Sequence, residues 1–341
     1  MEVHRVQALA ESGLSQVPPQ YIQPTPSLRT TSSSSSSSSS VPLIDLSSSS
    51  SLLRHIPAAC KDWGAFQLVN HGVPDRLLDS IRSVGLGFFG SPIESRETFA
   101  CDPRRPASEG YGSKMLSKSD GVLDWRDYFD HHTLPLSRRD PDRWPDFPPN
   151  YREVIVEYSE HMKVLAQKLL GIISRSLGLG DEYIQDAVGE VYQNITISYY
   201  PACPQPELVI GLQPHSDMGV ITLLVQDDVG GLEVLKDGEW VLVEPLKDAI
   251  VVILADQMEI ISNGQYISAQ HRATVNTNRA RLSVATFYDP SKSRKIFPAP
   301  KLVKEGSPAR YREVVYGDYV SSWYSTGPDG RRNLDALLIQ P

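Results

Sequence analysis

The feature that most constrains this chain is a series of short β-type runs that begins at Tyr192 and continues to about Tyr288. The runs are rich in β-branched and aromatic residues and are separated by turn residues, a pattern typical of strands. Several short strands at such close spacing predict a β-sandwich or a β-barrel. The runs are YQNITISYY, VITLLVQ, GLEVL, WVLVEP, AIVVILA, YISAQHR and RLSVATFY.

The chain before Tyr192 has helical spacing instead. Apolar residues between Tyr151 and Leu177 recur at intervals of three and four, which predicts a long amphipathic helix. Residues 101–124 are rich in Pro, Gly, Ser and Lys and predict a long loop. We therefore expect a mixed α/β protein of the α+β class. The expected regions are a mostly helical part over 41–180, a β core over 190–292, and a C-terminal extension over 293–341 that packs on the core.

Residues 1–40 form an N-terminal leader that ends in a Ser-rich linker. Such a tract cannot bury enough apolar surface to pack, so we expect the leader to be partly disordered. Glu2 and Glu11 and the lack of an apolar stretch argue against a secretory signal. Chloroplast import is disfavoured because acidic residues are present and arginine is scarce.

The composition favours a soluble, cytoplasmic protein. The 341 residues carry a net charge of −8 with no basic block, so neither a nucleic-acid nor a membrane-surface partner is expected. No apolar run approaches the roughly 18 residues that span a bilayer. The three cysteines are far apart, which fits a reducing compartment. The cytoplasm is the expected compartment, and the nucleus is also compatible. We expect a monomer that binds a small-molecule substrate.

Three residues in the β region have the chemistry of metal ligands: His215, Asp217 and His271, here called the triad. Side chains alternate along a strand, so His215 and Asp217 lie on one face. Two imidazoles and one carboxylate leave coordination positions open, the arrangement of non-haem Fe(II) oxygenases. One His-x-Asp pair is a weak signal by itself, and the second histidine within the same series of strands strengthens it.

A cation and two hydroxyl groups form a second candidate group. Arg281 and Ser283 share a face of the run RLSVATF, where a guanidinium can grip a carboxylate through two parallel hydrogen bonds. Tyr200 shares a face with Ser198 in SYYP, and its hydroxyl could donate to the same carboxylate. We call Arg281, Ser283 and Tyr200 the clamp.

Eight features spread over roughly residues 41–325 resemble the plant soluble 2-oxoglutarate/Fe(II)-dependent dioxygenases. That family includes anthocyanidin synthase, flavonol synthase and many hormone and specialised-metabolite hydroxylases. The features are VPLIDL, DWGAFQLVNHGV, EGYGSK, WRDYFDHHTLP, SYYPACPQPELVIGLQPHSD, the Gly230–Gly231 pair, ISNGQYISAQHR and RLSVATFYDP.

The resemblance implies a double-stranded β-helix (jelly-roll) core with flanking helices. It implies that the triad binds Fe(II) and that the clamp holds the distal carboxylate of 2-oxoglutarate, whose keto-acid end chelates the metal. O2 would be the second co-substrate, and ascorbate is an expected stimulant in vitro. The implied reaction is hydroxylation or desaturation of a small, aromatic plant metabolite or hormone, with conversion of 2-oxoglutarate to succinate and CO2.

The resemblance also points to substrate-pocket residues: Phe287, Tyr111, Lys114 and Thr196. Phe287 shares a face with Arg281, so its ring could stack on an aromatic substrate. Thr196 stands at an inward position where some relatives carry a basic residue that pairs with an acidic substrate. A threonine there favours a neutral substrate.

Some positions depart from the family pattern or belong to no predicted site. Ser198 stands where the family usually has asparagine, so its role toward the co-substrate is open. Asp256 has no histidine two positions away and is expected to be structural. His131 and His132 are adjacent in an expected strand and face opposite sides, which predicts structural or surface roles.

Three other functions stay open. An ethylene-forming type of oxidase has the same fold and uses ascorbate instead of 2-oxoglutarate. A ligand-binding protein on an inactive dioxygenase scaffold would keep the fold without turnover. A structural zinc domain is the third, although three ligands without a fourth indicate an open site.

Overall fold

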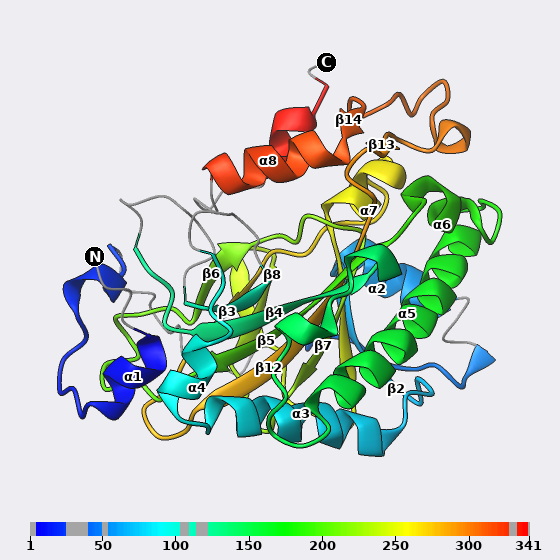
Figure 1. Ribbon diagram of the computed structural model, residues 1–341. Helices are drawn as coiled ribbons and strands as arrows, with labels where there is room; N and C mark the ends of the chain where they lie inside the picture. Colours follow the sequence, from blue (N-terminus) through cyan, green and yellow to red (C-terminus); the bar gives the residue numbers. More distant parts are fainter. Residues whose placement is uncertain are drawn as a thin grey trace.

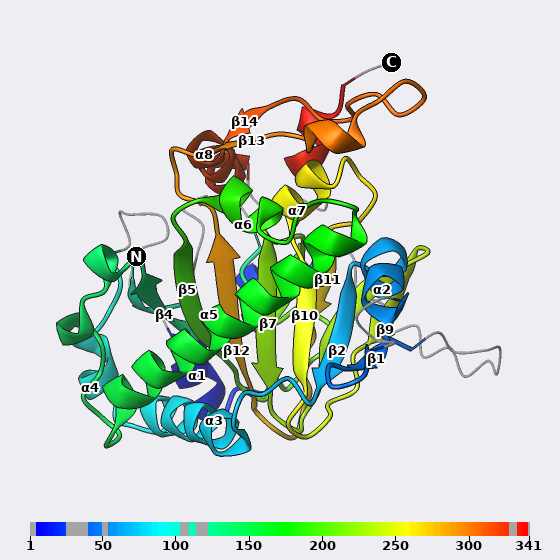
Figure 2. The ribbon, with the colours of Figure 1, turned by 90° about the vertical axis from the view of Figure 1, so that its right-hand side faces the viewer.

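The computed structural model describes residues 5–24, 40–49, 54–102, 109–113, 122–326 and 333–339. Two β-sheets form its centre, and long helices cover the outer face of the larger sheet (Figures 1 and 2). The predicted α+β class is confirmed. Lys114 and most of the Ser-rich linker lie outside the described residues.

The larger sheet has eight strands in the order β1-β2-β10-β7-β12-β5-β4-β3. All neighbouring strands are antiparallel except β1 and β2, which are parallel. The strands are β1 (Leu43–Asp45), β2 (Ala65–Val69), β3 (Gly110–Gly112), β4 (Asp127–Leu134), β5 (Tyr192–Tyr200), β7 (Ile221–Gln226), β10 (Ile250–Leu254) and β12 (Arg281–Asp289).

The smaller sheet has four strands in the order β6-β11-β8-β9. They are β6 (Leu212–His215), β11 (His271–Ala273), β8 (Leu232–Lys236) and β9 (Glu239–Leu242). Antiparallel pairing of β11 with β6 places His271 directly opposite His215. Two residues far apart in the sequence are thus brought together by backbone pairing alone.

Helices α3 (Asp75–Phe89) and α5 (Tyr151–Ser176) cover the outer face of the larger sheet, as Figure 2 shows. The apolar side of α5 is buried as its spacing predicts, at Ile155, Tyr158, Met162, Leu165, Leu169, Ile172 and Ile173. A Cβ atom on Gly85 of α3 would lie 3.0 Å from Ile197 and 3.1 Å from Leu282. A side chain at position 85 would therefore require Ile197 and Leu282 to shift, whereas glycine lets α3 approach β5 and β12 closely.

The segment between residues 101 and 124 contains a short strand where the sequence predicts only loop. Strand β3 pairs with β4 at the edge of the larger sheet, with Tyr111 opposite Phe129. Gly110 has a φ of +125°, and a Cβ there would lie 2.6 Å from the carbonyl oxygen of Phe99. The backbone of β3 thus needs glycine at position 110. The strand has too few β-type residues to be recognised from the sequence.

The N-terminal residues 5–24 pack against the body of the protein. The N-terminus of helix α1 (Val6–Glu11) lies against Asp127. The Asp127 carboxylate accepts hydrogen bonds from the amides of Val6 and Gln7 at 3.0 and 2.9 Å. A carboxylate at a helix N-terminus satisfies unpaired amides and complements the helix dipole. Arg5 adds an ion pair with Glu97 at 2.6 Å.

The chain after β12 continues over one end of the two sheets (Figure 1). Helix α8 (Tyr316–Thr326) lies beside α7 (Asp256–Ile261), and the Tyr319 hydroxyl donates to the Asp256 carboxylate at 2.6 Å. The remaining helices and strands are α2 (Ile56–Asp62), α4 (Ile93–Glu97), α6 (Tyr183–Val188), β13 (Lys295–Ile296) and β14 (Val314–Val315), with 3-10 turns at Pro19–Tyr21, Leu136–Arg138, Pro141–Arg143, Pro300–Leu302 and Asn333–Leu337. Among the described residues, no helix has the length and apolar character needed to span a bilayer.

Phe88 tests the packing of α3 on the sheet. Its buried ring contacts the rings of Phe89, Tyr111, Phe129, Phe147 and Tyr151. We expect Phe88→Ala to lower the free energy of unfolding by about 3–5 kcal/mol, because it removes apolar contacts and leaves a cavity. Urea denaturation followed by tryptophan fluorescence measures the change. Leu86→Ala on the same helix, where the side chain is 50% exposed, should cost about 1 kcal/mol or less.

Candidate functional site

The triad converges between the two sheets. His215 ends β6, Asp217 follows two residues later, and His271 begins β11. One ligand-type atom from each side chain lies within 4.8 Å of the others, the one such group found among the described residues. The Asp217 Oδ1 atom is 3.6 Å from Nε2 of His215 and 3.8 Å from Nε2 of His271.

Hydrogen bonds fix which atoms of the triad face one another. The Nδ1 atoms of His215 and His271 lie 2.7 Å and 3.1 Å from the carbonyl oxygens of Gln213 and Ala269. Because a carbonyl can only accept, each Nδ1 carries a proton, and in the neutral imidazole Nε2 keeps the lone pair. In that form, both histidine lone pairs point toward the same carboxylate oxygen.

Thr222 fixes the carboxylate. Its hydroxyl donates to Oδ2 of Asp217 at 2.6 Å, which leaves Oδ1 turned toward the two imidazoles. Partners of this kind, behind the ligand atoms, orient the ligands of metal sites. A cation between three inward lone pairs would remove their mutual repulsion, so the donor set fits a divalent metal such as Fe(II).

Burial keeps His215 in the form that a metal requires. Burial first, and the neighbouring His271 second, hold the pKa of the His215 imidazole well below its usual value. The ring centroids of the two histidines are 4.3 Å apart, so two imidazolium charges would repel strongly. The neutral imidazole is the form that binds metal ions.

Backbone contacts hold the Asp217 loop in place. The amide of Asp256 donates to the carbonyl of Asp217 at 2.9 Å, and the amide of Gln257 donates to that of Gly219 at 2.9 Å. The Asp256 carboxylate itself accepts from Tyr319 and is outside the metal-type cluster. Asp256 is therefore structural, as expected, and α7 supports the loop that carries a triad residue.

The clamp residues also come together. Pairing of β12 with β5 sets Arg281 opposite Tyr200, and Ser283 opposite Ser198. The guanidinium lies 5.0 Å from the Tyr200 ring centroid and donates to Oε1 of Gln226 at 3.3 Å. All these residues share the face of the larger sheet that looks toward the smaller one, as alternation predicts.

Arg281 is a buried cation with unused hydrogen-bonding capacity. It is 2% exposed, and its Nε has no hydrogen-bond partner among the described residues. No carboxylate in the described part of the chain forms an ion pair with it. Because a buried guanidinium requires compensation, the site fits a carboxylate-bearing ligand such as 2-oxoglutarate.

The surroundings of Tyr200 are cationic. Although burial raises the pKa of the Tyr200 hydroxyl, the guanidinium groups of Arg126 and Arg281 and hydrogen bonds with Ser283 and Ser198 together lower it below its ordinary value. Arg126 also donates to the Ser198 hydroxyl at 3.2 Å. Ser198 thus contacts Arg126 and Tyr200, and sequence reasoning missed Arg126 because it precedes β4, far from β5 in the chain.

Two predicted substrate residues lie on the same inner face. Phe287 is paired across the strands with Thr222, the residue that holds Asp217. Thr196 is paired with Ala285 of β12 and with Asp130 of β4. Ala285 and Phe287 are partly exposed although β12 is a central strand, so solvent reaches this part of the inner face.

Tyr111 lies elsewhere. It is paired with Phe129, whose ring faces α3, and its own ring is fully buried against Phe88 with Arg5 4.2 Å from its centroid. This placement corrects the prediction that Tyr111 lines the substrate pocket. The short strand β3 turns the side chain toward the helices, and α1 covers it. The prediction for Lys114 lies outside the described residues.

Other inner-face residues were missed by sequence reasoning. Asp130 and His132 of β4 occupy alternate positions on that face, and Asp289 ends the inward series on β12. His131 faces the helices, where its Nε2 lies 2.9 Å from the Tyr151 hydroxyl. Asp130 is two positions after Tyr128, so the two residues share a face of β4. That this is the inner face becomes clear only from the pairing of β4 with β5, where Tyr128 lies opposite Ser198.

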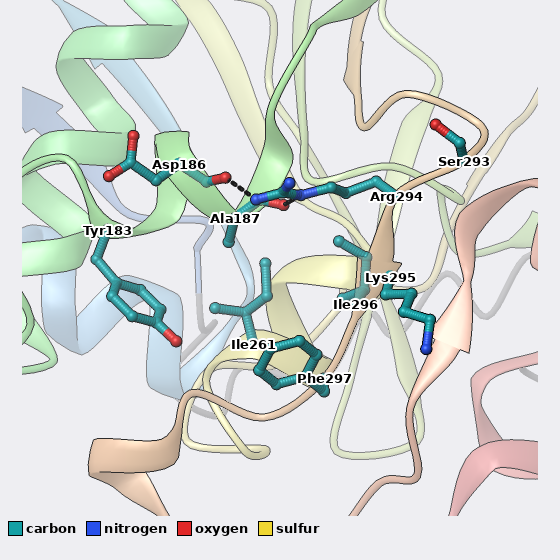
Figure 3. A pocket seen from close by; sticks show the side chains of 9 residues that line it. All are labelled: Tyr183, Asp186, Ala187, Ile261, Ser293, Arg294, Lys295, Ile296 and Phe297. Carbon is teal, nitrogen blue, oxygen red and sulfur yellow. Dashed lines mark hydrogen bonds between the residues drawn. The ribbon is translucent and has the colours of Figure 1, made fainter.

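A hollow of about 520 Å³ lies away from these residues, between α6, the end of α7 and β13 (Figure 3). Its cations already have partners. Arg294 donates to the carbonyls of Asp186 and Ala187, and Lys295 forms an ion pair with Glu313 at 2.7 Å. Neither the triad nor the clamp lines this hollow, so it is not the candidate active site.

Comparisons with protein families match two parts of the chain. Residues 192–290 match the 2OG-Fe(II) oxygenase superfamily. Residues 41–150 match the N-terminal region described as non-haem dioxygenase in morphine synthesis. The first match contains the triad and the clamp.

Individual proteins are similar over nearly the whole chain. Jasmonate-induced oxygenase 2 of Arabidopsis thaliana is 39% identical over 98% of this chain and 92% of its own length. Flavonol synthase/flavanone 3-hydroxylase of Petunia hybrida is 38% identical, covering 94% of both chains. The crystal structure of JOX2 in complex with 2OG, Fe and JA has a TM-score of 0.91 and 38% identity over 100% of this chain and 99% of that one. The predicted jelly-roll core is confirmed by this likeness.

Replacing Thr222 tests whether it supports a metal site. We expect Thr222→Val to weaken binding of Co²⁺ about tenfold, because Asp217 loses the hydrogen bond that turns Oδ1 toward the imidazoles. Isothermal titration calorimetry measures the dissociation constant. Thr286→Val is the matched control, since Thr286 lies on the helix-facing side of β12. Equal affinities in the two variants would contradict the role of Thr222.

Proposed function

This chain belongs to the 2OG-Fe(II) oxygenase superfamily, and from that premise we propose that His215, Asp217 and His271 hold its iron. The protein is a 2-oxoglutarate-dependent dioxygenase that oxidises a small organic metabolite and converts 2-oxoglutarate to succinate and CO2. The observation that carries the proposal is the pair of Nε2 atoms that face Oδ1 of Asp217 at 3.6 and 3.8 Å.

The clamp is the proposed site of the distal carboxylate of 2-oxoglutarate. The unpaired Nε of Arg281 supports this assignment, because a bound carboxylate would satisfy it. Ser283 and Tyr200 supply hydroxyl groups beside the guanidinium. The opposite, keto-acid end of the ligand would then reach toward the triad.

The chain contributes binding and orientation. When bound, Fe(II) activates O2 and couples decarboxylation of the keto acid to oxidation of a C–H bond. Thr222 and the backbone of Gln213 and Ala269 hold the ligand atoms in one orientation. No side chain is needed as a general base, because this chemistry transfers no proton to the protein.

We propose a neutral, aromatic substrate that is bound over Phe287. The ring of Phe287 offers an apolar stacking surface next to Thr222 and therefore close to Asp217. Relatives named for leucoanthocyanidin and flavonol chemistry support an aromatic substrate. Hydroxylation and desaturation are both compatible with this arrangement.

We further propose that the protein acts as a monomer in the cytoplasm. The support is its acidic net charge and its three unpaired cysteines, which fit a reducing compartment.

The central test is formation of succinate from 2-oxoglutarate by the Fe(II)-loaded enzyme. Asp217→Ala should reduce turnover on the order of 100-fold or more, because one ligand and its charge are lost. A panel of candidate metabolites, read by mass for the gain of one oxygen or the loss of two hydrogens, identifies the substrate. Turnover with ascorbate alone would support the ethylene-forming alternative, and full activity after iron removal would contradict the proposal.

Arg281→Gln tests the clamp separately. The change removes a buried cation and should raise KM for 2-oxoglutarate on the order of 30-fold or more, while Fe(II) affinity stays within about threefold of wild type. Steady-state succinate assays measure KM. Arg279→Gln, at an exposed arginine paired with Asp228, is the control and should leave KM unchanged. An unchanged KM in Arg281→Gln would remove the clamp from the proposal.

A further inference from the structure

Asp130 lies on the inner face of the larger sheet, in the same cross-strand row as Thr196 and Ala285. The next row along the strands contains Phe287 and Thr222, so the carboxyl group belongs to the region of the proposed substrate site. Asp130 is 5% exposed, and no lysine or arginine of the described residues forms an ion pair with it. A buried carboxyl group without a lysine or arginine partner is costly, and such groups concentrate at functional sites.

The groups around Asp130 form a surface that offers hydrogen-bond acceptors to a ligand. Thr196 donates its single hydroxyl hydrogen to Oδ1 of Asp130 at 2.8 Å, so its oxygen can only accept from a ligand. Oδ2 of Asp130 lies 3.6 Å from Nε2 of His132, a distance too long for a direct hydrogen bond. The carboxyl group therefore keeps acceptor capacity on the side of Oδ2.

A second carboxyl group closes the same region. Asp289 is the last inward residue of β12, and a Cβ atom on Gly219 would lie 1.7 Å from its Oδ1. Its carboxyl group therefore lies against the loop that carries Asp217. Burial raises the pKa of Tyr324 in α8, and the nearby carboxyl groups of Asp130 and Asp289 raise it further.

Two arginines lie close enough to oppose the rise in the pKa of Asp130 that burial causes, but neither forms an ion pair with it. Arg138 stacks 4.6 Å from the Tyr192 ring centroid and donates to the Leu134 carbonyl at 3.2 Å. Arg126 donates to Ser198, toward the clamp. Each guanidinium thus uses part of its hydrogen-bonding capacity on other protein groups.

We propose that Asp130 determines specificity by accepting a hydrogen bond from a hydroxyl or amino group of the substrate, and that it excludes substrates with a carboxylate at that position. The inference rests on the proposed function, since it assumes that the substrate lies over Phe287. A ligand donor would complete the hydrogen bonding of a buried carboxyl group, whereas a ligand carboxylate would face two acidic groups. Thr196 acts as a positioning residue that holds the Asp130 carboxyl group in place.

Matched ligands that differ in one group test the proposal. Tryptophol, tryptamine and indole-3-acetate form one set, and 2-phenylethanol, 2-phenylethylamine and phenylacetate form another. Calorimetry with the Fe(II)- and 2-oxoglutarate-loaded enzyme, without O2, measures each dissociation constant. We expect the alcohol and the amine to bind on the order of tenfold or more tighter than the acid of the same set.

Asp130→Asn should reduce this preference to about threefold or less, because the amide has no charge and can donate to a carboxylate. Asp142→Asn, at an exposed aspartate, is the matched control and should keep the wild-type preference. Thr196→Val is a second variant that keeps the Asp130 charge and should weaken binding of the alcohols and amines. A thermal melt of each variant verifies folding.

Three results would overturn the inference: acids that bind as tightly as alcohols and amines, a preference unchanged in Asp130→Asn, or no binding in either set. Succinate formed without added substrate separates this failure from failure of the proposed function. If wild-type enzyme forms succinate but favours acids, only the role of Asp130 is wrong. If it forms no succinate under any condition, the dioxygenase assignment itself fails.

Discussion

The hydrogen bond from Thr222 to Asp217 joins the two sheets at the point where the candidate metal ligands meet. Thr222 belongs to β7 in the middle of the larger sheet, and Asp217 follows β6 at the edge of the smaller one. Since one carboxylate oxygen accepts this bond, the other is directed toward the two imidazoles. Pairing of β11 with β6 then sets His271 opposite His215. The geometry of the site thus depends on the spacing between the two sheets, because the Thr222–Asp217 hydrogen bond bridges them.

Strand β12 has a stabilising face and a functional face. On β12, Leu282 and Val284 are buried toward α3 and α5, whereas Arg281 and Ser283 point to the opposite side. A polar interior with a cation and several carboxyl groups stabilises no protein by itself, because buried charges lose their hydration. The apolar packing of the two helices offsets that cost. The functional face can therefore carry residues chosen for ligands.

Strand alternation explains why some site residues could be predicted from the sequence and others could not. The triad and the clamp lie in runs with clear β character, so parity alone places Arg281 beside Ser283 and Phe287 on one face. Tyr111 follows a glycine in a strand too short to recognise, and the N-terminal helix that covers it is separated from it by about a hundred residues. Asp130 and His132 lie in a predictable strand. Which of its faces is the functional one depends on the partner strand β5, which no local pattern specifies.

The inner face of β12 carries opposite charges at its two ends, with Arg281 at the start and Asp289 at the finish. The same polarity recurs on β4, two strands away, where Arg126 precedes the strand and Asp130 lies further along it. Two ligands that share one interior must not exchange places, and a charge gradient is a direct way to prevent it. The proposed roles predict that a dicarboxylate binds at the arginine end and a donor-bearing molecule at the aspartate end. Because Thr222 lies opposite Phe287 between these ends, the metal ligand that it holds is placed where the two molecules would meet.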